Sequence, residues 1–175
     1  MIVVAIVVVA GAVAVVRPSL ADKESTVDER WEPVGEVLIS RYDELSLLAN
    51  AIDDASDSTR DVVSETREAL GAWAEVVDGD QAVEEQVEVA NTLEGLAARL
   101  QASVLSSSRL AADPAVVGQL EALDATVVPV GLVETYNEAV RDYDDERGSL
   151  LARPVAGAFG FGARSAFAPV GGTEG

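Results

Sequence analysis

The side chains best suited to chemistry in this sequence form two clusters of carboxylates. One contains Asp53, Asp54 and Asp57, and the other contains Asp142, Asp144, Asp145 and Glu146. Oxygen ligands of this kind suit Ca²⁺ or Mg²⁺. However, neither cluster has the alternating spacing and central glycine of a calcium-binding loop, and consecutive residues of a helix point in different directions. We therefore interpret both clusters as solvated helix faces and predict no metal site.

Most other site chemistry is removed by composition, because the 175 residues include no histidine and no cysteine. Without cysteine there is no disulfide, thiolate nucleophile or thiolate zinc site. Without histidine there is no Ser-His-Asp or Cys-His site and no Glu-x-x-His di-iron ligand set. Gly157, Gly160 and Gly162 lack the full spacing of a phosphate-binding loop. We predict no catalytic residue and no cofactor, with catalysis by carboxylates or a lone lysine as the open alternative.

The charge balance restricts the class of partner. Acidic residues number 31 and basic residues 12, for a net charge of -19, and Lys23 is the sole lysine. Nucleic-acid binding is disfavoured, because attraction to phosphate requires a basic surface. At about 1 M salt the Debye length is only about 3 Å, so self-repulsion is screened. The composition favours a salt-adapted protein, and the alternative is an ordinary acidic helical bundle.

The first 16 residues, MIVVAIVVVAGAVAVV, carry no charged side chain. As a helix they would cover about 24 Å, close to the hydrocarbon core of a bilayer at roughly 30 Å. A signal peptide is the alternative, with cleavage before Val15 or Asp22, but the basic n-region is absent. We predict an uncleaved single-pass anchor over residues 1–17. Arg17 and Lys23 follow the apolar run, which favours a cytoplasmic position for the rest of the chain.

The elements that must position any site are helices, since apolar residues recur at three- and four-residue spacing throughout residues 26–149. Separate helices are expected on either side of a break near Ser56 to Ser58, because one helix over residues 26–77 would be about 78 Å long and outrun its neighbours. A third helix is expected from residue 81, and a fourth over residues 114–148. We predict an all-α fold: an antiparallel up-and-down four-helix bundle with an N-terminal transmembrane helix.

Prolines and capping residues mark the predicted boundaries. Arg17-Pro18 is expected to end the anchor, with residues 18–25 as a polar linker. Asp113-Pro114 predicts the N-cap and first turn of the last helix. Pro129 is expected to kink that helix, and Pro154 to exclude a helix from the Gly/Phe-rich tail over residues 150–175.

The end of the last predicted helix carries a recognisable pattern. It comprises Tyr136, Asn137, Val140 and Tyr143, followed by Gly157, Phe159, Gly160 and Phe161 in VAGAFGF. This arrangement resembles the C-terminal signature of the LemA family, whose members are membrane-anchored helical bundles with no agreed biochemical activity. Arg41-Tyr42-Asp43 with Leu45 resembles the first conserved block of that family, whereas Val133 stands where an arginine is usual.

The resemblance and the composition together predict a membrane-anchored interaction or scaffold domain whose protein partners are unknown. A domain that binds a small ligand or cation is the alternative, and a carboxylate-only enzyme is a less favoured one. Converging carboxylates in a cleft would favour the alternatives, whereas an apolar groove would favour the interaction domain. Asn137 is expected to form a hydrogen bond across the bundle and fix its register.

The tail suggests a second contact with the membrane. The candidate residues for that contact are Arg153, Phe159, Phe161, Arg164 and Phe167. If four antiparallel helices return the chain to the bilayer, the three rings enter its interface and the two arginines reach lipid headgroups. The alternative is that the rings cover the end of the bundle.

Overall fold

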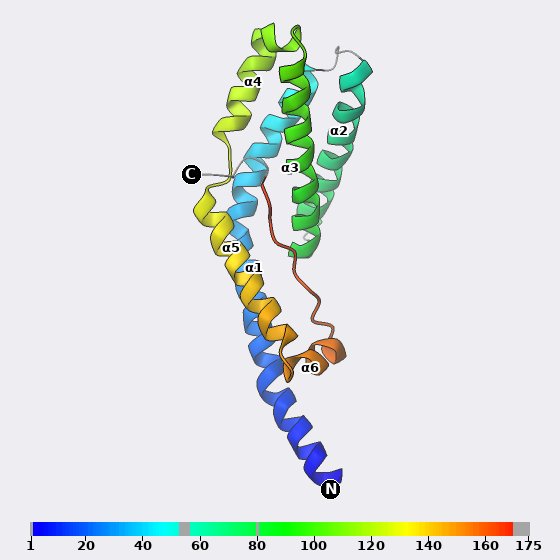
Figure 1. Cartoon of the computed structure of the whole chain (residues 1–175), viewed down its shortest axis with the longest axis vertical. Helices are drawn as coiled ribbons and strands as arrows, with labels where there is room; N and C mark the ends of the chain where they lie inside the picture. Colours follow the sequence, from blue (N-terminus) through cyan, green and yellow to red (C-terminus); the bar gives the residue numbers. More distant parts are fainter. Residues whose placement is uncertain (1, 53–56, 80, 170–175) are drawn as a thin grey trace. The chain divides into compact units, whose positions relative to one another are not determined.

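A computed structural model describes the backbone of residues 2–52, 57–79 and 81–169, with side chains described from residue 13 in the first range and from residue 59 in the second. Every regular element in these ranges is a helix, so the protein is all-α as predicted (Figure 1). The elements are α1 (Ile2–Ala51), α2 (Asp57–Asp78), α3 (Val83–Ser106), η1 (Leu110–Ala112), α4 (Pro114–Ala125), α5 (Val130–Gly148) and α6 (Ala152–Phe159).

The chain divides into two compact units. Unit 1 consists of residues 1–32 and 134–166, and unit 2 consists of residues 33–133 and 167–175. The divisions fall inside two helices, between Glu32 and Pro33 of α1 and between Val133 and Glu134 of α5. Each unit therefore takes part of α1 and part of α5, and each has its own packing.

In unit 1 the first part of α1 runs antiparallel to α5 (Figure 1). The buried side chains are Val16, Leu20, Val27 and Trp31 on α1 and Tyr136, Val140 and Tyr143 on α5. These positions recur at the spacing of one helix face, as the sequence predicts. The ring centroids of Trp31 and Tyr136 lie 5.1 Å apart with their planes at 57°, an arrangement that aromatic pairs favour.

In unit 2 the hairpin of α2 and α3 packs together beside residues 33–51 of α1. The core is mainly aliphatic and includes Leu38, Leu45, Leu48, Val62, Leu93, Leu100 and Leu123. The predicted separation of the first two bundle helices is confirmed: α1 ends at Ala51 and α2 begins at Asp57, while residues 53–56 lie outside the description.

The polar linker predicted over residues 18–25 is helical in the structure, because α1 continues through Pro18 without a break. A proline inside a helix removes one backbone hydrogen bond and crowds the carbonyl four residues earlier. Leu20 is fully buried just beyond it, and Val27 is buried two turns later. The packing of this apolar stripe offsets the free-energy cost of Pro18. Such tertiary packing is the usual source of helix stability in proteins.

The prolines near the C-terminus also behave differently from expectation. The predicted fourth helix is divided, since α4 ends at Ala125 and α5 begins at Val130 directly after Pro129. The Pro129 carbonyl accepts hydrogen bonds from the amides of Leu132 (2.9 Å) and Val133 (3.3 Å) and so starts a new helix. Pro154 lies in the first turn of α6, where an amide has no helical partner to lose.

The start of α4 follows the prediction closely. Asp113 is its N-cap, the Asp113 Oδ1 atom accepts a hydrogen bond from the Ala115 amide at 2.9 Å, and Pro114 occupies the first turn. This boundary can be predicted from sequence because both residues act locally, through their own side chain and ring.

Among the residues whose side chains are described, no single helix has both the length and the apolar composition needed to cross a membrane. The consecutive helices α4 and α5 satisfy the criterion only when they are taken together. The predicted anchor over residues 1–17 lies largely outside this test, because side chains are described only from residue 13.

Candidate functional site

The signature tyrosines of α5 hold the segment that follows α6. We call residues 161–166 the strap. The Tyr143 hydroxyl donates to the Gly162 carbonyl at 2.8 Å, and the Tyr136 hydroxyl donates to the Ser165 carbonyl at 2.9 Å. Both tyrosines are fully buried. Each hydroxyl thus satisfies a backbone acceptor of the strap.

The spacing of these two bonds explains the spacing of the tyrosines. Seven residues of α5 cover about 10.5 Å, while three residues of an extended chain cover about 10 Å. Tyr143 therefore meets Gly162 and Tyr136 meets Ser165, with the strap running antiparallel to α5. The seven-residue spacing of the tyrosines in YN-x-AV-x-x-Y therefore matches the three-residue spacing of their acceptor carbonyls in the strap.

Arg164 ties the same strap to α1. Its Nη2 atom lies 3.0 Å from Glu24 Oε1 and 3.3 Å from Asp28 Oδ1. Glu24 and Asp28 are four residues apart and so lie on one face of α1. The Arg164 side chain is only 11% exposed. Both helices of unit 1 therefore contact the strap, α5 through hydroxyl groups and α1 through carboxylates.

Burial shifts the titration of two groups around the strap. It raises the pKa of Asp28, an effect that the charge of Arg164 opposes. The Asp28 Oδ1 atom is buried and receives no hydrogen bond from the described residues, although Arg164 is within ion-pair distance. Burial also raises the pKa of Tyr143, and the negative charge of Glu24 adds to this rise.

Gly160 ends α6 immediately before the strap. Its φ of 78° lies in the left-handed region, which glycine adopts without strain. The Phe161 amide then donates to the Ala156 carbonyl at 3.0 Å. Gly157 differs, since it is exposed within α6 and a Cβ atom there would meet nothing within 4 Å. Of the three tail glycines singled out by the sequence, Gly160 is the one with a conformational requirement.

The predicted membrane residues divide into two groups. Phe167 is buried, at 1% exposure, and Arg164 is held by two carboxylates. Membrane contact by these two side chains stays a prediction, and it would require them to leave the contacts that they make here.

The other three candidates lie nearer the surface. Phe159 is 48% exposed, and the Arg17 guanidinium carbon lies 5.1 Å from the centroid of its ring. Arg153 is exposed, and Phe161 is half-buried. These residues keep a membrane contact open as a prediction.

The remaining signature positions and the acidic clusters have mixed surroundings. Val140 is buried, and Asn137 is half-buried on α5, where its expected cross-bundle hydrogen bond stays a prediction. The cluster at residues 53–57 lies outside the described side chains. In the second cluster, Asp144 Oδ1 accepts from Arg147 Nε at 3.1 Å, which leaves that carboxylate with an ionic partner on its own helix.

Unit 2 contains a buried ion pair that sequence reasoning missed. Arg41 Nε and Nη2 donate to the two carboxylate oxygens of Glu94 at 2.7 and 3.1 Å, and Nη1 donates to the Leu123 carbonyl at 2.8 Å. Both side chains are almost fully buried. The signal was the position of Glu94 next to Leu93 on the inner face of α3, where a charge requires a partner.

Tyr42 extends this network on the neighbouring position of α1. Its hydroxyl donates to the Ala90 carbonyl at 3.1 Å, and its ring meets Trp73 edge-on with centroids 5.0 Å apart. Burial raises the pKa of Tyr42 strongly, and the charge of Glu94 adds to the effect. The polar groups of Arg41, Tyr42 and Glu94 thus satisfy one another and nearby backbone carbonyls, which indicates a structural role for this network.

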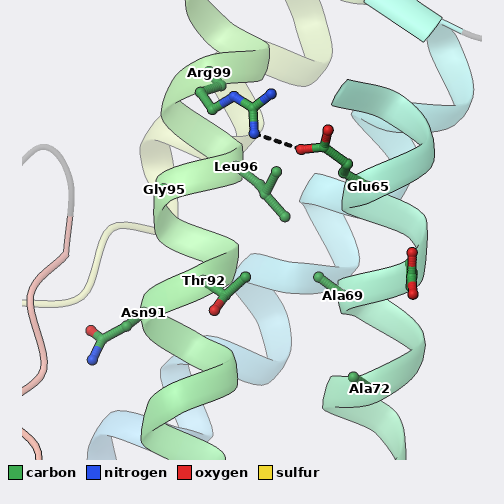
Figure 2. Close-up of a pocket in the computed structure, with 9 residues that line it drawn as sticks. Glu65, Ala69, Ala72, Asn91, Thr92, Gly95, Leu96 and Arg99 are labelled. Carbon is green, nitrogen blue, oxygen red and sulfur yellow. Dashed lines mark hydrogen bonds and ion pairs between the residues drawn. The ribbon is translucent and has the colours of Figure 1, made fainter. Parts of the chain in front are cut away.

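One surface hollow of unit 2 lies between α2 and α3, and we call it the α2–α3 groove (Figure 2). A second hollow, of about 410 Å³, lies between α1 and α2 beside Tyr42 and Trp73. The volume of the α2–α3 groove is about 550 Å³, and its walls are predominantly apolar. The lining residues are Glu65, Glu68, Ala69, Ala72, Asn91, Thr92, Gly95, Leu96 and Arg99. Arg99 Nη1 and Glu65 Oε2 form an exposed ion pair of 2.6 Å across its end, and Asn91 points away from α2.

No protein-family model matches this chain, and no curated protein matches it. The assignment of a function therefore depends on the chemistry of the groove and of the strap.

Proposed function

We propose that this chain is a membrane-anchored helical interaction module, similar to proteins of the LemA family, that binds a protein partner. Residues 1–17 would anchor it as a single-pass helix, with the helical units on the cytoplasmic side. The remaining architecture would be an up-and-down four-helix bundle, for which α1, α2, α3 and α4 supply consecutive helices in unit 2.

One observation carries the proposal: the α2–α3 groove is open and mainly apolar. Of its two carboxylate residues, Glu65 is already paired with Arg99 at 2.6 Å. Sites that bind small molecules are usually enclosed and place several polar groups around one point. An open apolar surface between two helices instead suits another protein.

The alternative functions receive less support. Within the described residues, no three acidic side chains converge on a point where a cation would bind. Glu94 is a buried carboxylate, at 1% exposure, and Arg41 occupies both of its oxygens. A general acid or base needs access to substrate. We therefore do not assign Glu94 a role in carboxylate-only catalysis.

The proposal is tested by recovering the full chain from native membranes. The tagged chain should sediment with membranes, and after mild cross-linking and detergent extraction it should be recovered with stoichiometric protein partners. A variant lacking residues 2–16 should move to the soluble fraction, because the apolar run would be lost.

Two results would contradict the proposal. Recovery of the chain alone after cross-linking would contradict the proposed role as an interaction module. A mature N-terminus at Val15 or Asp22 would show that the apolar run is a cleaved signal peptide and would contradict the predicted anchor. N-terminal sequencing of the membrane-bound protein separates the two questions.

A further inference from the structure

We infer that the α2–α3 groove is a docking surface for a basic amphipathic helix of a partner protein. This inference rests on the proposed interaction function and identifies the surface and the chemistry of its occupant.

The floor of the groove permits close approach of another backbone. The lining contains the small residues Ala69 and Ala72 of α2 and Gly95 of α3, and the buried Leu96 side chain points toward α2 (Figure 2). A Cβ atom built on Gly95 would meet nothing within 4 Å, so the space above this glycine is open. Small residues at such positions let helices pack at short interaxial distances.

The length of the groove matches a helical occupant. Its lining extends from Glu65 to Ala72 on α2 and from Asn91 to Arg99 on α3, which is about 10 to 12 Å along the helix axes. That distance covers about two turns of a third helix laid along the pair. Anchors at three- and four-residue spacing would then fill the space between the small residues.

Charge around the groove specifies the polar face of the occupant. Glu68 lines the groove. Asp61 and Glu75 extend the same face of α2, and Glu88 extends that of α3, at three- or four-residue spacing from lining residues. All four side chains are exposed, and none has an ionic partner in the described structure. The Glu65–Arg99 pair contributes no net charge.

These carboxylates favour a partner rich in arginine or lysine beside its apolar stripe. The same charge disfavours nucleic acid and anionic lipid. An apolar stripe flanked by basic residues is the pattern of an amphipathic helix that binds in a groove.

The test measures peptide binding to the full chain in a neutral detergent. The probe is a fluorescent peptide of about 18 residues, with alanine and leucine on one helical face and arginine on the other. A shuffled peptide of identical composition controls for attraction to the overall negative charge. We expect the ordered peptide to bind at least about tenfold more tightly than the shuffled one.

Two matched variants locate the binding. Gly95→Phe places a ring in the open space of the groove and should weaken binding of the ordered peptide about tenfold. Gly118→Phe adds the same ring on α4, where a Cβ atom also meets nothing within 4 Å, and should change binding by less than about twofold. Circular dichroism checks that both variants fold.

A second pair avoids bulky side chains altogether. Glu68→Arg should weaken the ordered peptide, whereas Glu121→Arg on exposed α4 surface should match the loss that net charge alone produces. Equal binding of the two peptides, or equal effects of the paired variants, would overturn the groove as the docking surface. If partners were still recovered from membranes, the interaction module would stand without this site.

Discussion

Arg41 in unit 2 and Arg164 in unit 1 make comparable contacts in different surroundings. Arg41 is buried with both Glu94 oxygens and the Leu123 carbonyl around it. Arg164 joins the strap to Glu24 and Asp28, whose side chains are 32% and 44% exposed. Burial makes the first pair hard to break without leaving an unpaired charge. Water and salt reach the second pair, so it contributes less to stability and weakens as the ionic strength rises.

The surfaces of the two units differ in the same way. In unit 1 the strap covers α5, and the hydroxyls of Tyr136 and Tyr143 bind its carbonyls. In unit 2 the α2–α3 groove is lined by residues of those two helices. The first surface is covered by the chain's own backbone. The second is open and mainly apolar, and its lining residue Asn91 accepts a hydrogen bond from the Ala168 amide at 2.9 Å. The comparison separates a structural contact from a candidate functional one.

The largest expected effect comes from breaking the buried pair. Glu94→Ala should lower the free energy of unfolding by about 3–5 kcal/mol, because Arg41 would be left charged and unpaired in the interior. Chemical denaturation of the full chain measures the loss. The double variant Arg41→Met with Glu94→Leu should recover much of it, since neither charge then remains. If Glu94→Ala lowered the free energy of unfolding no more than breaking an exposed ion pair does, the contrast between the buried pair of unit 2 and the accessible pair of unit 1 would be contradicted.

A smaller effect is expected at the strap. Tyr143→Phe removes one hydroxyl donor and should cost about 1 kcal/mol, the usual net value of a hydrogen bond. Amide hydrogen exchange over residues 161–166 should accelerate about fivefold if the strap opens locally. Tyr42→Phe provides the control, because its hydroxyl donates to Ala90 in unit 2. Unchanged exchange in Tyr143→Phe would mean that the ring alone holds the strap.

The smallest expected effect is the pH dependence of stability that arises from Asp28, and it tests how a partly buried carboxylate differs from an accessible one. Since the pKa of Asp28 is raised in the folded protein, the folded state holds this proton more tightly than the unfolded chain. The stabilisation is complete below the ordinary value of 3.8 and is lost as the pH rises through the folded pKa. Solvent exposure of Asp28 keeps the change small.

Thermal unfolding between pH 3.8 and neutrality measures this dependence. Asp28→Asn should flatten it, while Asp145→Asn on the exposed surface of α5 should leave it unchanged. Identical profiles for the two variants would show that Asp28 does not respond to its burial beside the strap.

The local sequence was sufficient to determine the all-α class, the separation of α1 from α2 and the start of α4. The helical class and the Asp113-Pro114 cap depend on neighbours within a few residues. The separation of α1 from α2 follows from comparing the lengths of the predicted helices. The tyrosines of α5 were also singled out by their spacing. Their hydrogen bonds to the strap were not, because a pattern on one helix does not show which segment lies against it.

Only the tertiary structure decided the long-range ion pairs and the α2–α3 groove. Arg41 and Glu94 are 53 residues apart in the chain, and Arg164 and Glu24 are 140 apart. The energy of such pairs depends on distance and on loss of water, which are set when helices pack. Packing also carried α1 through Pro18 and left open space over Gly95. Local preferences are additive along the chain, whereas burial is a property of the assembled fold.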